Sequence, residues 1–122
     1  MSTIKADNWQ PSAGGTSVDI GGGLSKTWCH LNGTGTIAIQ DSLGISSVVD
    51  GGTGHYGFNF TSEFTSASYN GVGSCGTVAT GAACQPDNGS LAVGSMYFDT
   101  FNSGTGLTDN NIVMMNLHGS LA

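Results

Sequence analysis

Apolar and polar positions alternate along much of the chain after residue 24, and this period of two predicts β-strands. The clearest alternation is in residues 55–60, where every second residue is aromatic. These three side chains, which share one face of the predicted strand, are Tyr56, Phe58 and Phe60. We therefore expect one face of this strand to be buried in a core.

Residues 26–31 show the same alternation and are followed by a turn signal. Two sets of side chains alternate there, Trp28 and His30 on one face and Thr27, Cys29 and Leu31 on the other. Asn32-Gly33 comes next and is a strong signal for a tight hairpin turn. The following strand is therefore predicted over residues 34–40, with Ile37 and Ile39 on one face.

Clusters of turn residues divide the rest of the chain into further short strands. These strands are predicted over residues 43–49, 69–75, 91–98 and 111–118. Residues 76–84 form either a loop of small residues or an edge strand, and residues 101–109 form a long loop. No stretch longer than a turn has a helical period. About six to eight short strands joined by turns predict an all-β fold, an antiparallel β-sandwich or jelly-roll-like domain.

The first 23 residues lack any sustained period of apolar and polar residues, so we predict an extended arm that is hinged at a run of three glycines. The β-sandwich domain is predicted to follow over residues 24–122. The arm holds four isolated apolar residues, which are Ile4, Trp9, Val18 and Ile20. Two interpretations are open. The segment is either a loose chain terminus or a docking arm whose apolar residues bind a larger partner.

The predicted strand over residues 111–118 is apolar on both faces, because Ile112 and Met114 alternate with Val113 and Met115. A half-buried antiparallel strand should be polar on one side. The strand is therefore either central, between two layers, or part of a subunit contact. We favour the subunit contact, made through Ile112, Met114 and Met115, since methionine is common at adaptable surfaces.

Glycine is unusually abundant, with 21 residues in a chain of 122. Each ordered glycine gives up much backbone freedom on folding, and a domain of this size has only a thin core. Both effects make self-association a natural source of stability, so we expect a homo-oligomer.

The formal net charge is −6, with only two lysines and arginines together. Nucleic-acid binding and membrane-surface binding through a basic face are therefore not expected, since both depend on basic side chains. The first ten residues contain an acidic residue and no apolar run, so no secretory signal is predicted, nor does any window approach the roughly 20 apolar residues of a membrane span. We expect synthesis and assembly in a cytoplasm.

The chain offers little catalytic chemistry. The three histidines, His30, His55 and His118, are far apart and lack metal-binding spacing, and no nucleophile elbow is present. Most acidic residues sit at turns, with calcium binding at residues 109–111 the weaker alternative. Trp28 and the aromatic row of residues 55–60 are interpreted as core, not as sugar-stacking platforms. We predict no enzymatic activity, cofactor or metal.

Three cysteines, Cys29, Cys75 and Cys84, are present. An odd number in a chain made in a cytosol indicates buried thiols first. Cys75 and Cys84 flank a short loop and can approach each other across a hairpin, so a disulfide between them is the alternative.

Residues 26–69 and the first seven residues resemble a recurring module of tailed-bacteriophage fibre and particle-surface proteins. The segments that carry the resemblance are residues 26–28, 31–36, 39–42, 45–48, 50–54, 56, 59–61 and 67–69, with the opening Met1-Ser2-Thr3-Ile4-Lys5-Ala6-Asp7. Their order and spacing are moderately specific. The chain departs from the module at residues 69–73, where glycines replace the usual alternating aliphatic residues.

The resemblance implies a homotrimeric β domain on the outer surface of a virion, with no catalytic residues. Because the chain is too short for a fibre shaft, it suits a capsid decoration, cement or head-fibre protein whose arm binds the major capsid protein or another virion protein. The alternative is a tail-fibre or spike tip module that binds a host receptor.

Overall fold

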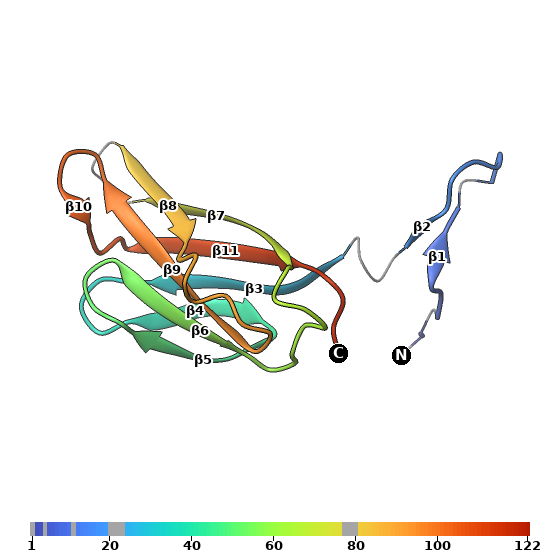
Figure 1. Cartoon of the computed structure of the whole chain (residues 1–122), viewed down its shortest axis with the longest axis horizontal. Helices are drawn as coiled ribbons and strands as arrows, with labels where there is room; N and C mark the ends of the chain where they lie inside the picture. Colours follow the sequence, from blue (N-terminus) through green and yellow to red (C-terminus); the bar gives the residue numbers. More distant parts are fainter. Residues whose placement is uncertain (1, 4, 11, 20–23, 77–80) are drawn as a thin grey trace.

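Two antiparallel sheets pack face to face in the computed structural model of the chain (Figure 1), which describes residues 2–3, 5–10, 12–19, 24–76 and 81–122. All the strand pairs are antiparallel, and the described residues contain no helix. The predicted all-β sandwich is therefore confirmed.

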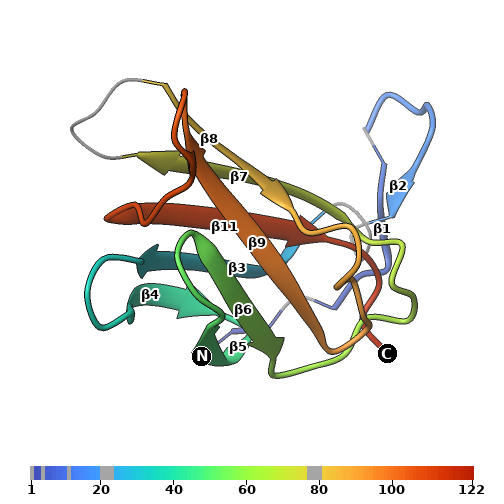
Figure 2. The same cartoon turned by 60° about the vertical axis from the view of Figure 1, so that its left-hand side comes forward.

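Strands from distant parts of the sequence make up each sheet. The first sheet has the order β4-β3-β11-β7, with bounds Ala38–Leu43, Ser25–Asn32, Ile112–His118 and Asn70–Gly76. The second has the order β10-β9-β6-β5, with bounds Gly106–Leu107, Ser95–Asn102, His55–Phe60 and Ile45–Asp50, and β8 (Ala82–Pro86) pairs with β9. Figure 2 shows β9 and β6 crossing over the strands of the first sheet.

The core lies between the sheets and follows the predicted alternation. In β3 and β6, the inward-facing residues Thr27, Cys29, Leu31, Tyr56, Phe58 and Phe60 are all buried. Val113, Met115 and Leu117 of β11 and Met96, Phe98 and Thr100 of β9 complete the buried layer. The pattern of every second residue therefore placed the aromatic side of β6 correctly in the core.

The arm forms a small hairpin of its own, in which β1 (Asn8–Trp9) pairs with β2 (Val18–Asp19) (Figure 1). Trp9 is paired with Val18 in this register. The other two residues of the predicted docking set, Ile4 and Ile20, lie outside the described residues. Docking by the arm stays a prediction.

The hairpin predicted at Asn32-Gly33 is confirmed, since β3 pairs with β4, but its predicted tight turn is wrong. The β3–β4 pairing ends at Asn32 and Ala38, so residues 33–37 form a longer connection. The Asn32 Oδ1 atom accepts hydrogen bonds from the Thr34 backbone N–H (3.0 Å) and the Thr34 hydroxyl (2.7 Å). Gly33 lies against the Tyr56 hydroxyl, with which any Cβ atom would overlap. A contact between the sheets thus fixes this connection and overrides the local turn signal.

The strand predicted over residues 91–98 begins later, at Ser95, and continues to Asn102. Its last two residues and β10 therefore occupy part of the predicted 101–109 loop. Backbone carbonyls just before it bind other segments. Gly94 accepts a hydrogen bond from the Phe60 N–H and Val93 accepts one from the Phe64 N–H, both 2.9 Å long. These bonds hold residues 93–94 at the end of β6 and outside the strand.

Glycines in β7 make room for large side chains of the core. The strand pairs with β11 along its whole length, from Asn70 to Gly76. A Cβ atom at Gly73 would overlap the Phe98 ring, and one at Gly71 would overlap the Leu117 side chain. The glycines at which residues 69–73 depart from the phage module therefore leave space for Phe98 of the other sheet and Leu117 of the neighbouring strand.

We predict that Gly73→Ala lowers the stability of the domain by about 1–3 kcal/mol, because the added methyl group overpacks the core against Phe98. Gly76→Ala is the matched control, since it lies in the same strand and its Cβ atom would meet nothing within 4 Å. Urea unfolding of both variants measures the difference. Equal stability of the two variants would contradict the packing described here.

Candidate functional site

The outer face of the β4-β3-β11-β7 sheet carries two rows of side chains that cross all four strands. The strand register places opposite residues on the same face. The first row is Leu43, Trp28, Asn116 and Val72, and the second is Asp41, His30, Met114 and Ser74. The two rows border a shallow hollow of ≈ 550 Å³.

Several apolar side chains on this face are exposed. The exposed fractions are 62% for Val72, 51% for Leu43, 40% for Met114 and 39% for Ile112. We call these four residues, together with Trp28, the apolar face. Single exposed apolar residues are ordinary, but a group of them on one sheet is typical of an interaction site.

Trp28 belongs to this outer surface, so its predicted place in the core is wrong. It is half-buried, whereas its neighbours Thr27 and Cys29 are each 1% exposed and point inward. The alternation of residues 26–31 contained the signal, because a residue between two core positions of a strand faces the other way.

The three residues of the predicted subunit contact separate in the structure. Ile112 and Met114 lie on the apolar face, but Met115 is only 2% exposed and packs in the core. β11 is a central strand whose inner side belongs to the core and whose outer side exposes Ile112 and Met114. Only Ile112 and Met114 are therefore available to another subunit.

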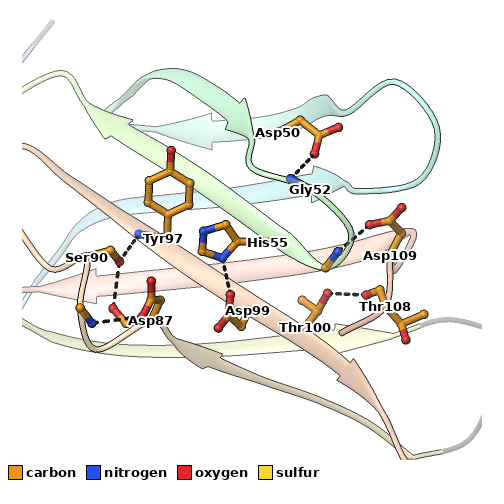
Figure 3. A network of polar contacts seen from close by, with 12 residues as sticks. Asp50, Gly52, His55, Asp87, Ser90, Tyr97, Asp99, Thr100, Thr108 and Asp109 are labelled. Carbon is orange, nitrogen blue, oxygen red and sulfur yellow. Dashed lines mark hydrogen bonds and ion pairs between the residues drawn. The ribbon is translucent and has the colours of Figure 1, made fainter. Parts of the chain in front are cut away.

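The outer face of the other sheet carries a network of polar and acidic side chains (Figure 3), beside the exposed Val49 and Leu107. His55 Nδ1 lies 2.5 Å from Asp99 Oδ1, and the His55 ring stacks on Tyr97 at 4.5 Å between centroids. Asp87 lines the same shallow depression as His55 and Asp99. Acidic side chains therefore gather on the sheet opposite the apolar face.

Among the described residues, no serine, threonine or cysteine side chain is hydrogen-bonded to the His55 ring, whose side-chain partner is Asp99. Ser90, which Figure 3 shows beside Tyr97 and Asp87, accepts a hydrogen bond from the Tyr97 N–H (2.8 Å) and donates one to the Asp87 carbonyl (2.9 Å). Its hydroxyl is thus used in a turn and not bonded to the imidazole. Within the described part of the chain, no group of three or more His, Cys, Asp or Glu residues is placed to hold a metal ion.

Asp109, for which calcium binding was the weaker alternative, has a structural role. Its Oδ1 atom accepts a hydrogen bond from the Gly54 N–H (2.7 Å) and lies 2.9 Å from the Tyr56 hydroxyl. That hydroxyl is also 3.0 Å from the Gly33 carbonyl oxygen. Burial raises the pKa of Tyr56, and the Asp109 carboxylate raises it further, so the hydroxyl stays a donor. We call Gly33, Gly54, Tyr56 and Asp109 the tyrosine node.

Comparison with known proteins gives no relative: no family model, no curated protein and no solved structure matches the chain. Among the described residues, no helix is long and apolar enough to cross a membrane. We therefore infer the function from the surface chemistry and from the resemblance in residues 26–69.

Removing one hydroxyl group tests the tyrosine node. We predict that Tyr56→Phe destabilises the domain by about 1–3 kcal/mol, because the Asp109 carboxylate and the Gly33 carbonyl both lose the neighbouring buried hydroxyl donor. Tyr97→Phe is the control, since the Tyr97 ring lies on the outer face, stacked on His55. Thermal unfolding at neutral pH compares the two. A similar loss in both variants would show that the node contributes nothing specific.

Proposed function

We propose that the chain is a non-enzymatic structural protein of a tailed-phage virion that self-associates through the apolar face. The observation that carries the proposal is the group of exposed apolar side chains on one sheet, around Trp28. An outward sheet face of this composition loses unfavourable contact with water when another surface covers it.

A second copy of the chain is the occupant that the charges favour. Copies with a net charge of −6 repel one another at long range, so a contact between them is best made where carboxylates are few. Asp41 is the one carboxylate in the two side-chain rows, whereas Asp87 and Asp99 lie on the opposite sheet. The trimeric state follows from the resemblance to the phage module.

The location on the particle also rests on the resemblance. Made in the host cytoplasm, the protein joins the outer surface of the virion as a capsid decoration, cement or head-fibre protein. Residues 1–23 bind the major capsid protein or another virion protein. No nucleic acid or membrane takes part in this attachment.

A second candidate function is recognition of a host receptor, which one feature of the hollow favours. The Trp28 side chain lies among polar groups of Asp41, His30 and Asn116. An apolar floor with a few convergent polar groups is typical of a small-ligand site, and a sugar is such a ligand.

A charge placed on the apolar face tests self-association. We predict that the wild-type chain is a trimer and that Met114→Asp shifts it to folded monomers, since a buried unpaired carboxylate strongly opposes association. Thr53→Asp adds the same charge at an exposed turn beside the other sheet and should leave the trimer intact. Light scattering gives the masses, and circular dichroism checks the fold.

A monomeric wild-type chain would refute the self-association, and a fully trimeric Met114→Asp variant would place the contact on a different surface.

Deleting residues 1–23 tests the docking arm. We predict a folded oligomer that no longer joins particles, because all the buried core residues lie between Cys29 and Leu117, outside the deleted segment. Co-sedimentation with particles that lack the protein measures the binding. Full decoration by the truncated chain would exclude the docking role. Adsorption of the purified wild-type chain to host cells, with competition against infection, would instead support receptor recognition.

A further inference from the structure

Two cysteines meet where the two sheets come together at one edge. Cys75 is in β7, the edge strand of the first sheet, and Cys84 is in β8, the edge strand of the second. β7 and β8 run side by side in Figures 1 and 2, and they are in contact although they belong to different sheets.

The strand registers direct both thiols into the space between the sheets. Cys75 is paired with the fully buried Val113, and Cys84 with the fully buried Thr100. Opposite residues of antiparallel strands share a face, so both sulfur atoms point inward from opposite sheets. Cys84 also packs against the core cluster.

The two thiols lie near each other in the space between the sheets. Burial and, to a smaller extent, the charge and hydrogen bond of the neighbouring Cys75 side chain together raise the pKa of Cys84 to about 12. Both cysteines are partly exposed, so a small oxidant can reach them. Cys29 differs, because it is buried and lies in β3, away from this edge.

We propose that Cys75 and Cys84 form a disulfide that joins the two sheets covalently once the protein meets a disulfide oxidant such as glutathione disulfide. The Cys75 thiolate attacks one sulfur of the oxidant and releases one glutathione thiolate. The Cys84 sulfur, after losing its proton, attacks Cys75 and displaces the second glutathione. The protein loses two protons and two electrons, and one glutathione disulfide becomes two glutathione molecules.

The bond stabilises the edge that holds part of the apolar face. β7 supplies Val72 to that face. As an edge strand, it is paired within its sheet with β11 alone. Closing a ring over residues 75–84 reduces the freedom of the unfolded chain, which stabilises the fold. The bond itself does not depend on the proposed phage role, so the two can fail separately.

Counting thiols in the purified full-length chain tests the proposal. Reduced protein is incubated with glutathione disulfide, denatured, labelled with N-ethylmaleimide and weighed by mass spectrometry. We expect one label on the oxidised chain and three on the reduced chain, which has three cysteines. The thermal midpoint of the oxidised chain should rise by about 10 °C.

Single substitutions identify the partners. Cys29→Ser should leave the oxidised chain with no label and the same rise in midpoint, whereas Cys75→Ser and Cys84→Ser should each abolish the rise. Three labels on the oxidised wild-type chain would overturn the proposal. So would a stable glutathione adduct, a disulfide that includes Cys29, or cross-linked dimers in place of the internal bond.

Discussion

The contact between Phe98 and Gly73 is the constraint on which the sandwich depends. The aromatic ring from one sheet lies directly over a strand position that has no side chain in the other, so the sheets approach closely there. Two residues earlier in β7, Gly71 leaves space for the Leu117 side chain of the neighbouring strand β11. Because of these glycines, Cys75 is the one inward side chain of β7. The strand is held in place by its pairing with β11 and its contact with β8.

The molecule also has two unlike outer surfaces, one on each sheet. With a thin core, every strand of both sheets has an outer side, and an antiparallel sheet normally turns a polar side to water. The outer face with His55, Asp87 and Asp99 gathers acidic side chains beside the exposed Val49 and Leu107, whereas the face with Met114 and Val72 groups exposed apolar residues around Trp28. In the proposed self-association, the acidic surface repels like-charged copies, and the apolar face loses water contact when it is covered.

The alternation of apolar and polar residues predicted the strands in which burial alone decides which side chains face the core. It placed Phe58 inward and, read consistently, places Trp28 outward, where the expectation of a core tryptophan rested on residue type. It failed where a distant group decides the geometry. Asn32-Gly33 forms no tight turn because the Tyr56 hydroxyl occupies that position, and the partners of Tyr56 and Asp109 are far apart in sequence. No local pattern carries such information.

The width of the apolar face bears on the choice between a macromolecular partner and a sugar. Leu43 and Val72 lie on the two edge strands, three strand spacings apart, which is about 14 Å. A single sugar ring can cover Trp28 in the hollow but leaves both edge residues in water. A second sheet face covers all of them at once, and it also closes the hollow. Self-association through this surface and sugar binding at Trp28 therefore exclude each other, and the exposed edge residues favour self-association.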